Sequence, residues 1–164
     1  MGLPERKSPR AQWHEYIGTE YFVTICTKGN AHYFGKVKNG QTQLTAIGEF
    51  LKKQIENTEM IRESRVSIPL YVIMPNHVHL IVIIFSGNNK ADARGASLQK
   101  FGPQSYTLGS IIRGIKSSVT HFANDNNINF GWQSRYHDHI IRDKNERNRI
   151  AKYIENNPVK WENR

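Results

Sequence analysis

The chain has 164 residues, of which 38% are hydrophobic and 10% aromatic, and this composition is typical of one globular domain with a buried core. Lys and Arg number 23 against 14 Asp and Glu, a formal net charge of +9, which favours a polyanionic partner and first of all nucleic acid. The longest apolar run, Leu80 to Phe85, is far shorter than the roughly 20 residues of a membrane span. The single cysteine, Cys26, excludes an internal disulfide and a cysteine-rich zinc site.

We therefore expect one domain over residues 1–164, without membrane association. The first residues are charged but lack the apolar segment of a secretory signal, so a cytoplasmic location is the default expectation. Basic residues alternate with aromatic ones in an N-terminal arm, residues 1–18, and the candidates for DNA contact there are Arg6, Lys7, Arg10 and Trp13. Such a mixture suits phosphates and stacked bases. An arm that simply docks on the core explains it equally well.

The first half of the chain alternates strand and helix patterns. Residues 21–27 are β-branched and aromatic, as in a strand. Two further runs, 31–37 and 41–44, flank Asn39-Gly40, which is a strong hairpin signal. A helix over 46–60 follows, with Thr45 as its N-cap.

His77 and His79 begin an apolar run that ends at Phe85 and follows a second apolar run, residues 68–74. Side chains two apart share one face of a strand, so the imidazoles point the same way. Because both faces of this run are apolar, it predicts a central strand, paired as a hairpin with the run before it. Two adjacent imidazoles at its start indicate a metal site or two histidines satisfied by hydrogen bonds.

The second half predicts two helices around a short strand. A flexible loop, residues 86–106, precedes an amphipathic helix that begins at Thr107 and presents Arg113 and Lys116 on its polar side, where they suit a DNA backbone or a solvated surface. A strand is expected within 130–141. The last helix begins at Asp143 and is expected to end near Asn156, because Pro158 follows.

Two histidines leave a metal shell incomplete. The candidates for a third ligand, all polar and late in the chain, are Gln133, His137, Asp138, His139, Asp143 and Asn157. Two imidazoles with an amide or carboxylate oxygen suit Mg²⁺ or Mn²⁺ engaged with a phosphate.

A basic chain with a metal site suggests phosphodiester transfer, in which a side-chain oxygen attacks phosphorus. Tyrosine suits a cleavage that must be rejoined. Tyr136 and Tyr153 are the candidates, and Tyr153 is favoured because it lies one helical turn from Asn157.

Four segments in order resemble the REP-associated tyrosine transposases of the HUH single-strand DNA transposase superfamily. These are residues 21–27, the Met74-Pro-Asn-His-Val-His-Leu80 motif, residues 132–142 and the Tyr153-Ile-Glu-Asn-Asn-Pro-Val-Lys160 motif. The resemblance implies an α+β fold of the HUH endonuclease type, a ferredoxin-like antiparallel sheet with helices packed on it. It also implies His77, His79 and Asn157 as ligands of a divalent metal and Tyr153 as the catalytic tyrosine.

The implied reaction is metal-dependent nicking and rejoining of single-stranded DNA, typically of palindromic hairpin repeats, through a 5′-phosphotyrosine. The protein would act as a monomer or a homodimer. Two other functions stay open: a domesticated protein that binds DNA or RNA hairpins without strand transfer, and another HUH nicking enzyme such as a replication initiator.

Overall fold

The computed structural model describes residues 18–62, 65–85 and 106–164. Within these described ranges, six strands, three α-helices and a short 3-10 turn follow one another along the chain. In order these are β1 (Gly18–Cys26), η2 (Lys28–Asn30), β2 (Gly35–Lys38), β3 (Gln41–Leu44), α1 (Ala46–Ile61), β4 (Val66–Met74), β5 (His77–Phe85), α2 (Leu108–Asp125), β6 (His137–Ile141) and α3 (Lys144–Glu162).

Four of the strands form one antiparallel sheet in the order β4-β5-β1-β6. Helix α1 connects β1 to β4, and α2 connects β5 to β6, so the core has the β-α-β-β-α-β order of a ferredoxin-like fold. The expected fold class is confirmed. β5 lies between β4 and β1, as its two apolar faces predict, and it pairs with β4 as an antiparallel hairpin.

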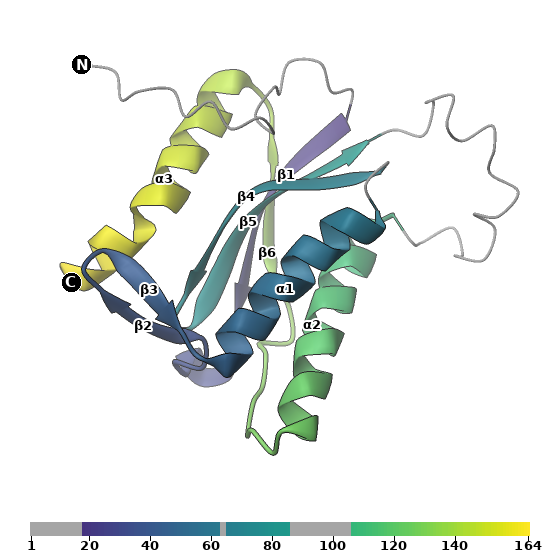
Figure 1. Ribbon diagram of the computed structural model, residues 1–164. Helices are drawn as coiled ribbons and strands as arrows, with labels where there is room; N and C mark the ends of the chain where they lie inside the picture. Colours follow the sequence, from purple (N-terminus) through teal and green to yellow (C-terminus); the bar gives the residue numbers. More distant parts are fainter. Residues whose placement is uncertain (1–17, 63–64, 86–105) are drawn as a thin grey trace, which may run out of the picture.

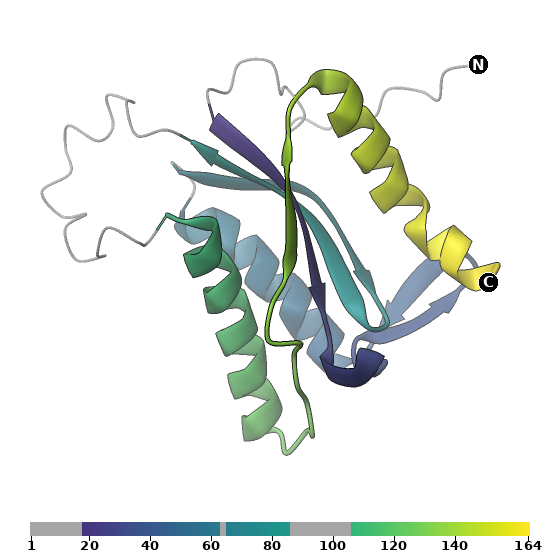
Figure 2. The same ribbon diagram turned by 180° about the vertical axis from the view of Figure 1, so that it is seen from behind.

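Helices α1 and α2 cover one face of this sheet, and α3 lies against the other (Figures 1 and 2). On one face, Val78, Leu80 and Val82 of β5 pack in a cluster with residues of α1 and α2. On the other face, Ile81 packs with Ile154 of α3 in a second, smaller cluster. Since side chains alternate along a strand, His77 and His79 lie on the same face as Ile81 and therefore on the α3 face.

The hairpin of β2 and β3 turns at Asn39 and Gly40, which both have positive φ angles, of 52° and 67°. These left-handed residues explain why Asn-Gly marks the turn. The expectation of a strand from residue 31 is wrong, because β2 begins only at Gly35. Thr45 caps α1 as expected, accepting a hydrogen bond from the Gly48 amide.

The prediction that α3 ends near Asn156 is wrong, since the helix continues through Pro158 to Glu162. Proline removes one backbone donor and destabilises a helix interior. Contacts beyond it hold the last turn: the Trp161 ring packs on His77, and the Glu162 carboxylate accepts hydrogen bonds from the turn at Asn39.

Two expected segments fall largely outside the described residues. The N-terminal arm is not described before Gly18, where β1 begins, and the loop is described only at its last residue, Tyr106, whose ring lies under the Arg65 guanidinium. In the described part of the chain, no helix is long and apolar enough to cross a membrane.

Candidate metal and nucleophile site

The two histidines of β5 converge through the same ring nitrogen. Their Nε2 atoms are 3.1 Å apart. Each Nδ1 atom has a separate partner: Asn76 Oδ1 lies 2.6 Å from His77 Nδ1, and Thr24 Oγ1 lies 2.8 Å from His79 Nδ1. Thr24 is brought there by register, because it lies opposite His79 in the β1–β5 pairing.

These contacts constrain the tautomers. An amide oxygen can only accept, so His77 Nδ1 donates to Asn76 and its Nε2 carries a lone pair. The Thr24 hydroxyl both donates and accepts. When it accepts from His79 Nδ1, both Nε2 lone pairs face the same point, which is the arrangement that a cation requires.

Burial keeps both imidazoles neutral. Desolvation, with a smaller contribution from the charge of Arg164, lowers the pKa of His77 to about 4. Desolvation, with a contribution from His77, lowers the pKa of His79 to about 3. Metal ligation needs neutral imidazole, so at neutral pH no proton has to be removed from either ring.

The residues around this point fit a small octahedral ion. Neighbouring ligands that are each about 2.1 Å from such an ion are about 3.0 Å apart, close to the observed Nε2 separation. Within the described residues, no three His, Cys, Asp or Glu side chains gather as a metal site, so a third ligand from among these residues would be of another type. Asn157 is buried, with 6% of its surface exposed, and its amide has no hydrogen-bond partner among the described residues.

Helix α3 aligns three side chains with the histidine pair. Tyr153, Asn157 and Trp161 are spaced four residues apart and share one stripe of the helix. The Tyr153 ring lies 5.2 Å from the His79 ring, and the Trp161 ring lies 5.9 Å from the His77 ring, measured between centroids. Asn157, between them, therefore faces the pair.

Tyr153 combines a fixed ring with an accessible side chain. Its ring meets Phe22 edge to face at 6.1 Å, and Phe22 itself stacks on His79 at 5.4 Å. The side chain is 41% exposed, and no described residue makes a hydrogen bond to its hydroxyl group. The ammonium group of Lys160 lies 5.9 Å from the ring centroid.

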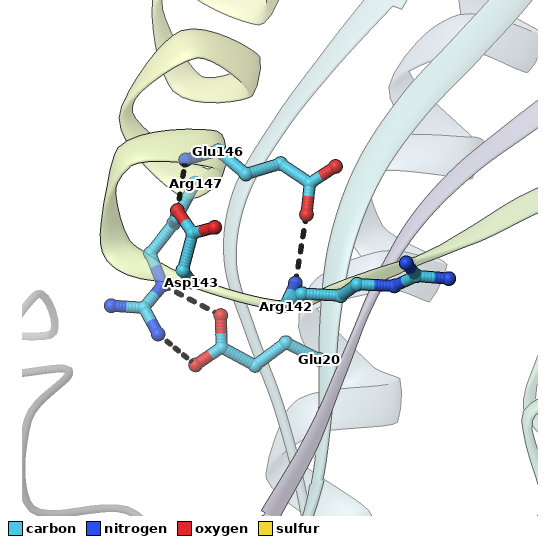
Figure 3. Close-up of polar contacts among 5 residues, drawn as sticks. All are labelled: Glu20, Arg142, Asp143, Glu146 and Arg147. Carbon is cyan, nitrogen blue, oxygen red and sulfur yellow. Dashed lines mark hydrogen bonds and ion pairs between the residues drawn. The ribbon is translucent and has the colours of Figure 1, made fainter.

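Polar contacts fasten the beginning of α3 to the sheet (Figure 3). Arg147 forms a two-point ion pair with Glu20, a buried carboxylate on β1. Asp143 caps the helix by accepting from the Glu146 amide at 2.8 Å, and Glu146 accepts from the Arg142 amide at 2.8 Å. The other Glu146 oxygen lies 2.6 Å from His139 Nε2.

The other candidates lie on the opposite face, are engaged in other contacts or belong to the edge strand, where His137 is opposite Thr24 in the β1–β6 pairing. Tyr136 packs in the cluster of α1 and α2, on the opposite face. Asp143 and His139 are engaged at the start of α3. His137 and Asp138 are exposed on the edge strand β6, and Gln133 bonds through its backbone to Cys26 and Lys116.

The predicted DNA contacts lie elsewhere. Arg113 is exposed on α2, and the Lys116 ammonium donates to the Gln133 carbonyl at 2.6 Å. Both belong to the helix on the face opposite the histidines. Arg6, Lys7, Arg10 and Trp13 lie outside the described residues.

Sequence reasoning missed Thr24, Phe22 and Trp161. Alternation along residues 21–27 places Thr24 and Phe22 on one face, but only the pairing of β1 with β5 places that face beside His79. Trp161 was missed because Pro158 was expected to end the helix before it.

No protein-family model matches the chain. An uncharacterized protein of Haemophilus influenzae is 39% identical over 168 residues, which cover 98% of this chain and 92% of that protein. A solved structure of the REP-associated tyrosine transposase bound to a REP hairpin has a TM-score of 0.58 at 23% identity, covering 88% of this chain and 70% of its own. A structure from Deinococcus radiodurans R1, with a TM-score of 0.44 at 17% identity, is too distant to support an argument. The chain belongs to the same family as the Haemophilus influenzae protein, and its fold is that of the REP-associated tyrosine transposase.

Proposed function

We propose that the chain is a transposase that nicks and rejoins single-stranded DNA through Tyr153. The observation that carries this proposal is the meeting of β5 and α3, which brings an accessible tyrosine to within 5.2 Å, ring to ring, of a converging histidine pair. A tyrosine that only stabilised the fold would be expected to be buried, and it would not need two neutral imidazoles beside it.

In this proposal His77, His79 and Asn157 hold Mg²⁺ or Mn²⁺, which when bound polarises the scissile phosphate and stabilises the leaving oxygen. Asn76 and Thr24 orient the two rings so that their Nε2 atoms face the ion. Asn157 contributes an uncharged oxygen, so the ion keeps its attraction for the phosphate.

Tyr153 is the nucleophile. Its Oη forms a bond to phosphorus while the bond from phosphorus to the 3′ oxygen breaks, leaving a 5′-phosphotyrosine and a free 3′-hydroxyl group. The phenol proton passes to water, which reaches the exposed side chain, and the departing oxygen takes a proton from water. The tyrosine ester conserves the energy of the broken bond, so a 3′-hydroxyl group can later attack it and rejoin the strand.

The proposed substrate is a hairpin formed by imperfect palindromic repeats. The net charge of +9 favours DNA, and the structural neighbour that shares the fold was solved with a REP hairpin. A single chain or a homodimer fits the proposal equally.

The test is adduct formation with a hairpin oligonucleotide labelled at its 3′ end, because the protein stays attached to the 3′ fragment. Wild-type protein with Mn²⁺ should give a covalent adduct that EDTA prevents. Tyr153→Phe should give none while still binding the DNA. Tyr136→Phe is the matched control, since Tyr136 lies on the opposite face, and it should form the adduct normally.

An adduct that persists in Tyr153→Phe overturns the assignment of the nucleophile. Wild-type protein that binds the hairpin and forms no adduct with either metal favours the alternative function, hairpin binding without strand transfer.

A further inference from the structure

Trp161 is a large aromatic side chain that belongs to neither hydrophobic cluster. Its ring lies 5.5 Å from the His32 ring and 5.9 Å from the His77 ring, and the Arg164 guanidinium carbon lies 5.8 Å from its centroid. All three of these neighbours are polar or charged. The cluster of Trp161, His32 and Arg164 is therefore poorly explained as core packing, and we call it the Trp161 cluster.

The Trp161 cluster lies at the opposite end of the site from the nucleophile. Trp161 and Tyr153 are eight residues apart on α3, a rise of about 12 Å along the helix axis. Tyr153 contacts His79 and Trp161 contacts His77. The histidine pair thus lies between the two rings.

The end of α3 is held in place by the β2–β3 hairpin, which lies beside it (Figure 1). The Glu162 carboxylate accepts from the amides of Asn39 and Gly40, at 2.8 and 2.6 Å. This contact fixes the turn of helix that carries Trp161. A fixed aromatic ring loses little conformational freedom when a ligand stacks on it.

We propose that the Trp161 cluster binds an unpaired nucleobase next to the cleaved phosphate. Aromatic rings bind single-stranded bases by stacking, and arginine adds a cation that attracts both the base and its phosphate. His32 is exposed and Trp161 is half-buried, so the cluster is open to a ligand.

This inference rests on the proposed function, and the direction of attack then identifies the nucleotide. In an in-line displacement the leaving oxygen lies opposite the nucleophile across phosphorus. With Tyr153 at one end of the histidine pair, the 3′ oxygen departs towards Trp161. The stacked base therefore belongs to the nucleotide on the 5′ side of the cleaved phosphate, the one that leaves with the free 3′-hydroxyl group.

The experiment measures binding of fluorescent hairpin oligonucleotides in EDTA, where no cleavage occurs. Abasic sites are introduced one at a time through the unpaired nucleotides. At a single position, loss of the base should weaken wild-type binding by roughly five- to hundredfold. The Trp161→Ala variant should bind intact DNA more weakly than wild type by the same factor. Removal of the base at that position should not weaken binding by this variant any further. Trp161→Phe should retain most of the affinity, and Trp161→Leu, which keeps the apolar volume without a ring, should behave like Trp161→Ala.

Because the scan needs no cleavage, it can succeed when the adduct assay fails and fail when that assay succeeds. If the loss of affinity from Trp161→Ala and the loss from an abasic site add independently at every position, the stacking proposal is overturned. It is also overturned by unchanged DNA binding by Trp161→Ala and Trp161→Leu combined with weaker Mn²⁺ binding, because that result would mean that Trp161 only supports His77.

Discussion

At the scale of single residues, the histidine pair depends on partners that ligand motifs do not include. In the proposed metal site, each imidazole needs a hydrogen bond at the nitrogen that does not bind the ion, and Asn76 and Thr24 lie at hydrogen-bond distance from these nitrogens. Asn76 precedes His77 in the sequence, whereas Thr24 is 55 residues from His79. The first partner is therefore local, and the second exists only once β1 and β5 have paired.

We expect Thr24→Val to weaken Mn²⁺ binding by roughly 10- to 100-fold without unfolding the protein. Valine keeps the shape of threonine but cannot hold the His79 ring in the tautomer that points its Nε2 lone pair at the ion. Isothermal titration with Mn²⁺ measures the change.

Thr42→Val is the matched control for this substitution. The Thr42 hydroxyl oxygen is buried and has no hydrogen-bond partner within the described part of the chain, so its removal should leave metal affinity unchanged. Equal affinities for Thr24→Val and wild type would mean that the contact with His79 does not orient the ring.

At the scale of elements, α3 is fixed to the rest of the fold at both ends, and it carries the proposed nucleophile and third ligand between these ends. Arg147 pairs with Glu20 near its start, and Glu162 binds the β2–β3 turn near its end. The stripe from Tyr153 to Trp161 lies between these attachments. Both attachments therefore help to hold these side chains beside the histidines of β5.

We expect Glu162→Ala to release the last turn of α3. The loss should cost about 1 kcal/mol of unfolding free energy, because the hydrogen bonds are charge-assisted but exposed. Hydrogen exchange should become faster at Asn39 and Gly40 and through Lys160–Arg164, while the first turns of α3 stay protected. Glu162→Gln, which keeps one acceptor oxygen, should show a smaller change.

Unchanged exchange at Asn39 and Gly40 in Glu162→Ala would contradict this role. Faster exchange throughout α3 would mean that Arg147 and Glu20 do not hold the start of the helix independently.

The same helix shows where prediction from sequence ends. Its start was predictable, because Asp143 and Glu146 form a local capping pattern. Its end was not, because the contacts that stabilise the helix beyond Pro158 come from residues 122 and 123 positions away in sequence. Sequence patterns indicate that proline destabilises a helix, but the tertiary contacts that compensate for it are seen only in the folded structure.

At the scale of the whole molecule, periodicity predicted the central strand and the helices, and the resemblance to the REP-associated tyrosine transposases implied the antiparallel sheet. Alternation also placed His77 and His79 on one face. It did not show that, among the described helices, α1 and α2 cover the opposite face and α3 covers this one. Arg113 and Lys116 therefore lie on the opposite face of the sheet from the histidines, although all four residues were expected to contact one substrate.

The histidine pair, with His79 buried and His77 half-buried, should also make the stability of the metal-free protein depend on pH. In the unfolded chain a histidine has a pKa near 6.5, whereas in the folded protein burial lowers the pKa of His77 to about 4 and that of His79 to about 3. Between these values the unfolded chain binds protons that the folded protein does not. The unfolding free energy should therefore be unaffected by the pair above pH 6.5, fall as pH decreases towards 4, and stop falling once both states are protonated.

Urea denaturation in EDTA at several pH values measures this dependence, and its slope gives the protons taken up on unfolding. Near pH 5 the pair should account for about two protons. The informative comparison is with His77→Gln/His79→Gln, which should take up about two protons fewer than wild type and lose less stability between pH 7 and pH 5. If wild type and the double variant have the same slope, the imidazoles are not held neutral by burial in the metal-free protein.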